Sequence, residues 1–134
     1  MKKLFSVVVI FLFLNSINVF ANDLFIFGGS SHDVFLGCIT CDENSSSSIF
    51  NDKSKYGLGN SYGVWNSLYS NYNNTYSSTS MCNEYASYPP IVVDKKGNYY
   101  GKLSLKEYDK DSVCYHSNKS KELCRLLKLM CLGN

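Results

Sequence analysis

Six cysteines in a short chain are the feature that most restricts how this sequence folds. The chain has 134 residues, and the cysteines are Cys38, Cys41, Cys82, Cys114, Cys124 and Cys131. An even number of cysteines in a small exported domain is typical of a disulfide framework, because so short a chain buries little apolar surface. Six cysteines allow 15 pairings. Spacing excludes those that join Cys124 to Cys131, which lie about 10.5 Å apart along a predicted helix.

The first 21 residues have the three parts of a secretory signal peptide. Lys2 and Lys3 form a positive start, residues 4–14 are an uncharged and mostly apolar run, and Val19-Phe20-Ala21 predicts cleavage before residue 22. Polar residues interrupt the run before it reaches the roughly 20 apolar residues of a membrane span. We therefore expect a periplasmic or secreted protein with no stable membrane anchor after cleavage, and one small domain over residues 22–134.

The charge of the expected mature chain excludes one class of partner. Without Lys2 and Lys3 it has 13 − 2 = 11 basic and 11 acidic residues. A formal charge of zero gives no basic surface for nucleic acid. The cysteine spacing after residue 82 is not that of a zinc finger or ribbon, and export favours disulfides over thiolate ligands. We predict no metal site and no cofactor.

The segment over residues 22–44 predicts a hairpin that carries a Cys-x-x-Cys pair. Residues 45–88 are rich in Ser, Asn and Tyr, and a four-residue unit of small, apolar, bulky and Asn residues recurs in them. Its copies are Ser48–Asn51, Gly63–Asn66 and Ser80–Asn83. We expect each Asn side chain to close a turn by hydrogen bonding to local backbone, and the units to stack as small β-type repeats.

The last third of the chain predicts a second hairpin and one helix. Within residues 89–108, a hairpin at about 91–105 turns at Gly97, where positive φ is needed. Leu123, Leu126, Leu127 and Met130 follow a helical period, so we expect a helix at about 118–132 (domain segment 117–132), started by Ser117 or Asn118 and ended by Gly133. The predicted fold class is a small β-rich α+β domain, stabilised by disulfides.

These segments together resemble a family of small exported bacterial proteins of uncharacterised function. Members carry an apolar strand with Gly-Gly, then Phe-Leu-Gly-Cys-x-x-Cys, repeats of the type Ser-Ile-Trp-Asn-x-Tyr-Gly, and a Pro-Pro-Val-x-Val-Asp hairpin. The matching residues here are Phe25–Gly29, Phe35–Cys41, Ser48–Asn51, Tyr62–Asn66, Tyr69–Asn83 and Pro89–Gly101. Ser70 and Asn73 replace the usual Gly, and Cys82 replaces the usual Trp. The resemblance covers most of residues 24–101 and implies no particular activity.

The Cys38-x-x-Cys41 pair admits several interpretations. A thiol-disulfide oxidoreductase site needs a helix that starts at the pair, but Asp42-Glu43-Asn44 and four serines follow, with no apolar helical period. A lipid anchor would need the cysteine directly after the signal's apolar core. Hydrolase chemistry at Cys114 and His116, or at Ser30 to Asp33, lacks a nucleophile elbow. A structural disulfide is the interpretation that we prefer.

We therefore expect a binding or structural protein that is not an enzyme. Its aromatic, Asn-rich repeat region is typical of surfaces that stack on sugars or present rigid rings to a protein. The expected contacts are Trp65, Tyr69 and Tyr72, and the expected partner is a protein or glycan of the cell envelope. A periplasmic oxidoreductase using Cys38 and Cys41, and a periplasmic inhibitor or immunity protein, are the alternatives.

Overall fold

A computed structural model describes residues 22–66, 70–116 and 121–132. The predicted signal peptide, Tyr69 and the predicted helix caps at Ser117, Asn118 and Gly133 lie outside the described residues. No helix within the described part of the chain is long and apolar enough to cross a membrane.

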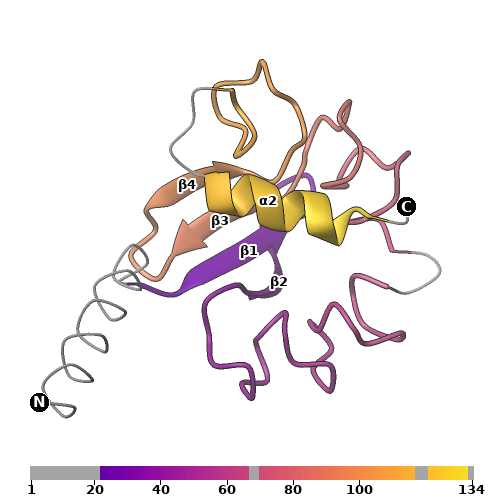
Figure 1. Ribbon diagram of the computed structural model, residues 1–134, viewed down its shortest axis with the longest axis vertical. Coiled ribbons are helices and arrows are strands. Elements are labelled where there is room, and N and C mark those ends of the chain that lie inside the picture. Colours follow the sequence, from indigo (N-terminus) through magenta and orange to yellow (C-terminus); the bar gives the residue numbers. More distant parts are fainter. Residues whose placement is uncertain (1–21, 67–69, 117–120, 133–134) are drawn as a thin grey trace, which may run out of the picture.

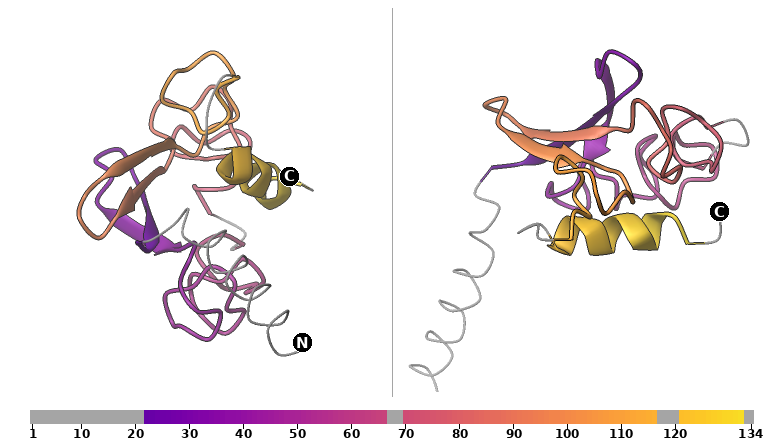
Figure 2. Two further views of the ribbon diagram at one scale, coloured as in Figure 1. Left: turned by 60° about the vertical axis from the view of Figure 1, so that its left-hand side comes forward. Right: turned by 90° about the horizontal axis from the view of Figure 1, so that it is seen from above.

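Among the described residues, the fold is a four-stranded antiparallel sheet with one helix, which confirms the predicted small β-rich α+β class (Figure 1). The strands are β1 (Leu24–Gly28), β2 (Val34–Cys38), β3 (Ile91–Asp94) and β4 (Tyr99–Lys102), in the order β2-β1-β3-β4 across the sheet. Helix α2 spans Lys121–Met130 and lies over one face of the sheet (Figures 1 and 2). The disulfides are Cys38–Cys41, Cys82–Cys131 and Cys114–Cys124, so Cys124 and Cys131 pair elsewhere, as predicted.

The turn of the second hairpin follows from its sequence. Gly97 has φ 82°, as predicted, and no atom lies within 4 Å of where its Cβ would be. The Asp94 carboxylate accepts hydrogen bonds from the N–H of Lys96 and Asn98, from the Asn98 side chain and from the Tyr100 hydroxyl. Burial opposes ionisation of Asp94, but these hydrogen bonds outweigh it and lower the pKa of the carboxyl.

The two hairpins are related by a pseudo-two-fold axis that passes between β1 and β3. Residues 24–27 correspond to 90–93, and residues 35–51 correspond to 99–115. The β1–β3 register is Phe25↔Val93, Ile26↔Val92 and Phe27↔Ile91, so Ile26 pairs with its own counterpart. A register shift falls after Ile26 in one hairpin and after Val92 in the other. We call residues 24–51 the first unit and residues 90–115 the second unit.

Backbone hydrogen bonds repeat the correspondence beyond the sheet. Each hairpin's last strand continues into a loop that returns to it ten residues later, as a parallel bridge from Cys38 to Ser48 and from Lys102 to Ser112. The N–H groups of Cys38 and Lys102 both donate over 2.7 Å, to the carbonyls of Ser47 and Asp111. The counterparts Ile39→Leu24 and Leu103→Pro90, and Ile49→Cys38 and Val113→Lys102, agree within 0.1 Å.

One glycine in each unit permits the loop to return so closely. Gly37 and Gly101 occupy corresponding positions and have φ 126° and 124°. A Cβ at Gly37 would lie 2.7 Å from the Ile49 side chain, and one at Gly101 would lie 2.8 Å from the Asp111 carbonyl oxygen. Only glycine adopts such a φ readily and leaves this space.

The chain between Ser45 and Asn66 turns every third residue. The N–H groups of residues 48, 51, 54, 57, 60, 63 and 66 each donate to the carbonyl three residues earlier. The bonds Leu58→Ile49 and Val64→Lys55 join residues nine apart, so three turns complete one coil. This spacing is shorter than the 15 to 17 residues between the predicted units, because serines such as Ser54 and asparagines such as Asn60 form intermediate turns.

Asparagine side chains close these turns, as expected. The Nδ2 group donates to the carbonyl six residues earlier at Asn51, Asn66 and Asn83, and also at Asn60. Serine hydroxyls accept the N–H two residues later at the buried Ser48, Ser54, Ser70, Ser80, Ser104 and Ser112. These local bonds satisfy backbone groups that the short strands leave unpaired.

The core lies between the sheet, the turns and α2. Trp65, the largest fully buried side chain, packs edge-to-face with Tyr72, with 6.4 Å between ring centroids. Its Nε1–H has no hydrogen-bond partner among the described residues, so apolar contact drives its burial. The other fully buried apolar side chains come from every part of the fold: Leu24, Ile26, Leu36, Ile49, Met81, Val92, Leu103, Val113 and Leu127.

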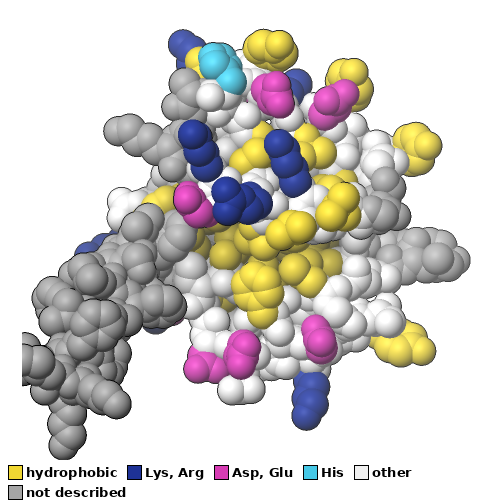
Figure 3. Space-filling model, in the orientation of Figure 1, with side chains coloured by type: hydrophobic (Ala, Val, Ile, Leu, Met, Phe, Trp, Pro, Cys, Tyr) yellow, Lys and Arg dark blue, Asp and Glu magenta, His cyan; other side chains and the backbone are white. Residues whose placement is uncertain are grey.

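Helix α2 lies between the loops of the two units, with the orange loop of residues 103–116 on one side and the magenta turns on the other (Figures 1 and 2). The disulfide Cys114–Cys124 joins α2 to the second unit. The disulfide Cys82–Cys131 joins the residue just after α2 to the segment of residues 70–89. On the side of the first unit, an apolar groove of about 340 Å³ remains between α2 and Phe50. Apolar side chains gather along this groove in Figure 3.

Candidate binding surface

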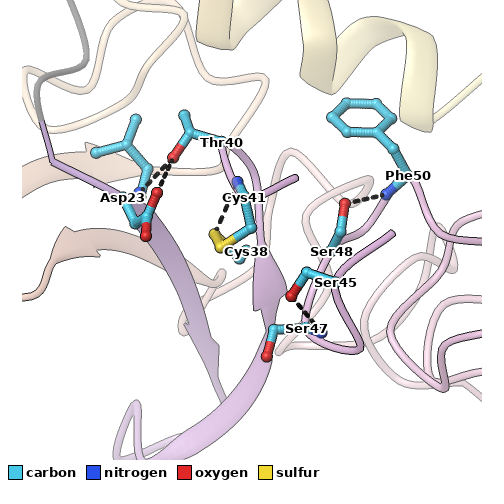
Figure 4. The surroundings of a disulfide bond; sticks show 9 residues. Asp23, Cys38, Thr40, Cys41, Ser45, Ser47, Ser48 and Phe50 are labelled. Carbon is cyan, nitrogen blue, oxygen red and sulfur yellow. Dashed lines mark hydrogen bonds between the residues drawn. A yellow bond between two sulfur atoms is a disulfide. The ribbon is translucent and has the colours of Figure 1, made fainter. Parts of the chain in front are cut away.

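The Cys-x-x-Cys pair is a disulfide at the end of β2 (Figure 4). Cys38 is fully buried, and the Cys41 N–H points at its sulfur, with 3.1 Å between nitrogen and Sγ. The residues that follow form turns in place of a helix, and the Asp42 carbonyl and carboxylate accept the N–H groups of Ser45 and Asn44. The pair therefore lacks the helix N-terminus that activates thiolates in thioredoxin-like sites.

Asp23 lies beside this disulfide. One atom each of Asp23, Cys38 and Cys41 lie within 4.8 Å of one another, and Thr40 links the carboxylate to β1 by accepting from the Leu24 N–H and donating to Asp23 (Figure 4). Metal ligation by cysteine needs thiolates. Both sulfurs are bound to each other here, so these three residues are not a metal-ligand set in the oxidised protein.

The residues predicted as surface contacts are not together on the surface. Trp65 is fully buried, so the prediction that it is an exposed contact is wrong: its large apolar ring gains more from the core than from water. Tyr72 is half-buried against the core. Tyr69 lies outside the described residues.

A different set of tyrosines projects into solvent. Tyr62, Tyr76 and Tyr85 have exposed fractions of 96%, 92% and 79%. Each stands two residues after an asparagine whose Oδ1 accepts the tyrosine N–H, over 3.0, 2.9 and 3.0 Å. The turn holds the backbone while the ring points outward. The pattern Asn-x-Tyr occurs at residues 60–62, 74–76 and 83–85, but it also occurs at residues 98–100, where Tyr100 is half-buried, so the pattern alone does not identify exposed rings.

Tyr85 shares a hollow with a fourth exposed tyrosine, Tyr108, whose exposed fraction is 87%. The hollow has a volume of about 500 Å³, and its lining residues are Glu84, Tyr85, Leu105, Lys106, Glu107 and Tyr108. A smaller hollow adjoins it through Glu84, Tyr85 and Leu105. Two rings, one leucine, one lysine and two carboxylates therefore line one open site.

Hydrogen bonds, a disulfide and a ring contact stabilise the two segments that form the walls of this hollow. The Asn83 side chain donates to the Ser77 carbonyl over 2.9 Å, and the neighbouring Cys82 is bonded to Cys131. On the other wall, the Glu107 carbonyl accepts the His116 N–H over 3.2 Å, and the Tyr108 and His116 rings lie 6.3 Å apart. The walls come from segments far apart in sequence, which is why sequence reasoning missed the site.

The Glu84 carboxylate lies next to the phenol of Tyr85. A side-chain hydrogen bond to Glu84 and the negative charge of this carboxylate raise the pKa of Tyr85. The Tyr85 hydroxyl donates to Glu84, so the site offers its oxygen and the carboxylates as acceptors beside two aromatic ring faces.

Comparisons of the chain with family models, curated proteins and solved structures find no significant match.

Proposed function

We propose that this protein is an exported, disulfide-stabilised binding protein whose ligand is a glycan of the cell envelope. The hollow between Tyr85 and Tyr108 carries the proposal, because it joins two exposed rings to the carboxylates of Glu84 and Glu107. A tyrosine ring gains a large contact area when a partner covers it, and its desolvation costs little. Exposed tyrosines are therefore efficient contacts.

The chemistry of the hollow favours a saccharide. A sugar ring has one apolar face of C–H groups, which stacks on an aromatic ring, and a rim of hydroxyls, which donate to carboxylates. The hollow is open, so a chain of sugars can enter and leave along it. The Asn83 turn holds the backbone of Tyr85 and so reduces the backbone entropy lost there on binding.

The disulfides support an extracellular or periplasmic location. All six cysteines are disulfide-bonded, and such frameworks persist in oxidising compartments. The predicted signal peptide, with cleavage after Ala21, also supports export.

The test is binding of the oxidised protein to isolated cell-wall glycans by co-sedimentation, using the double variant Tyr85→Ala/Tyr108→Ala. Each stacked ring is expected to contribute about tenfold in affinity, so we expect a loss of about a hundredfold. Tyr62→Ala/Tyr76→Ala is the matched control, since it removes equally exposed rings outside the hollow. Equal binding by both variants would contradict the proposed site, and absence of binding by the unaltered protein would contradict the proposed ligand.

The oxidoreductase alternative has less support, because Cys38 is buried and turns follow Cys41. Thiol titration during stepwise reduction separates the two functions. A redox site predicts selective reduction of Cys38–Cys41 with one thiol of low pKa, whereas a structural framework predicts resistance to mild reductant.

A further inference from the structure

Helix α2 presents two exposed surfaces beside its buried face. Leu123 and Leu127 are buried, and the disulfides of Cys124 and Cys131 hold the helix in place. The exposed face carries Lys121, Arg125 and Lys128, spaced four and three residues apart, so they lie along one side of the helix. Figure 3 shows basic side chains gathered over α2, with an acidic side chain beside them; Glu122 is the one acidic residue of the helix and is exposed.

The basic side borders a hollow without acidic residues. This hollow has a volume of about 290 Å³, and among the described residues it is lined by the three basic side chains of α2 together with Tyr115, His116 and their neighbours. Because no carboxylate among its lining residues offsets the positive charge, the hollow attracts an anionic group.

The apolar side carries large side chains that water surrounds. Leu129 and Leu132 have exposed fractions of 61% and 74%, and Phe50, across the groove, has 50%. Leu126 and Met130 complete the helix wall, and Leu58 and Trp65 lie below. Contiguous exposed side chains of this kind mark an interaction surface rather than ordinary surface composition.

We propose that this face of α2 binds the surface of a bilayer that contains anionic phospholipid. Lys121, Arg125 and Lys128 would lie against the phosphate headgroups, while Leu129, Leu132 and Phe50 enter the boundary between headgroups and acyl chains. A helix with basic residues beside exposed leucines lies in the plane of an anionic membrane interface in this way. The inference does not depend on the proposed glycan site, which involves other residues.

Charge selects the membrane over a second copy of the chain. A two-fold dimer through this face would place the basic stripe of one copy near that of the other, where like charges repel. An anionic lipid surface offers the opposite charge along the whole stripe. The contacts would be reversible, because they lie on the protein exterior and no helix in the described part of the chain is long and apolar enough to span a bilayer.

The pseudo-symmetry explains why the apolar side of α2 is open. Phe50 of the first unit corresponds to Cys114 of the second, and Cys114 is bonded to Cys124 of α2. One unit is therefore cross-linked to the helix, while the other faces it across the groove with a half-exposed phenylalanine.

The test is co-sedimentation of the exported, oxidised protein with vesicles of phosphatidylglycerol and phosphatidylcholine, compared with phosphatidylcholine alone. We expect binding only to the anionic vesicles, weakened by salt. Arg125→Gln/Lys128→Gln should weaken it about 25-fold, at about fivefold for each charge. Leu129→Ser/Leu132→Ser should weaken it at least tenfold.

Matched controls place the effect on α2. Lys95→Gln/Lys96→Gln removes two exposed charges from the β3–β4 turn, and Tyr76→Ser removes an exposed ring. Both should bind like the unaltered protein, and thermal unfolding checks that every variant is folded. Equal loss in the Arg125→Gln/Lys128→Gln and Lys95→Gln/Lys96→Gln variants, or binding to neutral vesicles alone, would overturn the proposal. A concentration-dependent dimer that Leu129→Ser/Leu132→Ser dissociates, without vesicle binding, would assign the face to a second copy instead.

Discussion

The two hairpin units share a backbone but differ in what closes the loop after the hairpin. In the first unit, Cys38 is bonded to Cys41. In the second unit, the residue that corresponds to Cys38 is Lys102, which forms an ion pair with Asp109 over 3.2 Å. Both loops return to the sheet through the same backbone hydrogen bonds.

The difference separates what the fold requires from what it tolerates. Between residues 35–51 and 99–115, the identical pairs are Gly37 and Gly101, Glu43 and Glu107, and Ser48 and Ser112. The glycines allow the close approach of the returning loop, and the serines are buried where their hydroxyls accept an N–H. Either a covalent bond or an ion pair can then occupy this position, because the backbone geometry is already set.

The largest effect is expected from alanine at the paired glycines. Gly37→Ala and Gly101→Ala add backbone strain of about 1–3 kcal/mol and an overlap that costs about 1–3 kcal/mol, so each should lower the free energy of unfolding by about 4 kcal/mol. Gly97→Ala is the control, because Gly97 has positive φ but open space, and its cost should be about 1 kcal/mol. Denaturant unfolding measures all three. A cost at Gly37 or Gly101 no larger than at Gly97 would refute the close-approach explanation.

The next effect concerns the two disulfides that distinguish the units. Cys114–Cys124 closes a separation of 10 residues and Cys38–Cys41 one of 3. Chain entropy predicts losses of about 3 kcal/mol for Cys114→Ser/Cys124→Ser and about 2 kcal/mol for Cys38→Ser/Cys41→Ser. Only the first change should loosen α2, since only the second unit is bonded to it. Amide hydrogen exchange of residues 121–130 checks this, and faster exchange in both variants would contradict it.

Acid should act on the second unit before the first. The folded-state pKa of Asp94 is lowered, below an unfolded value of about 3.9. Its carboxylate therefore stabilises the fold above that pH, and this contribution disappears as the pH falls through the folded-state pKa. The corresponding position in the first unit is Gly28, which has no carboxylate.

Hydrogen exchange of Lys102 and Val113, against Cys38 and Ile49, measures this asymmetry between pH 5 and pH 2. Asp94→Asn should reduce it, because the amide keeps the shape of the side chain without its charge, and the remainder should belong to Asp109, whose pKa is also lowered. Simultaneous loss of protection in both units at the same pH would contradict the assignment to Asp94.

The smallest effect belongs to the ion pair. The Lys102 and Asp109 side chains are 30% and 28% exposed, and exposed pairs contribute about 0.2–1 kcal/mol. The hydrogen bond from the Asp111 N–H lowers the pKa of Asp109, burial opposes this shift, and Lys102 adds to the lowering. Lys102→Met should thus cost under about 1 kcal/mol, and 1 M salt should remove the difference from the unaltered protein. A larger, salt-independent loss would show that Lys102 acts through the packing of its stem.

Some of the fold can be read from the sequence because its causes are local. Gly97 marks a hairpin turn, the spacing of Leu123, Leu127 and Met130 marks a helix, and asparagines mark turns that their own side chains close. The spacing of Cys124 and Cys131 also excludes one disulfide for a reason of helix geometry. Each of these depends on residues within a few positions of one another.

The candidate sites depend on packing between distant segments. Trp65 is of a residue type that is common in binding surfaces, but it lies in the core, because the surrounding turns enclose its ring. Tyr85 and Tyr108 line one hollow although they are 23 residues apart, and the disulfides Cys82–Cys131 and Cys114–Cys124 join both of their segments to the C-terminal part of the chain. A signal for the pseudo-symmetry is present in the sequence, as glycine followed eleven residues later by serine and a β-branched residue at 37–49 and 101–113. It is too short to stand out in a chain so rich in serine.

The sequence by itself therefore determined the class of fold, the turns and the helix, since backbone conformation follows from short-range hydrogen bonds and the period of apolar residues. Only the tertiary structure decided the disulfide pairing, the pseudo-two-fold relation of the hairpins, and which aromatic rings meet water. Those features follow from which distant surfaces pack together, and burial of a side chain is a property of the whole fold rather than of its neighbours in the chain.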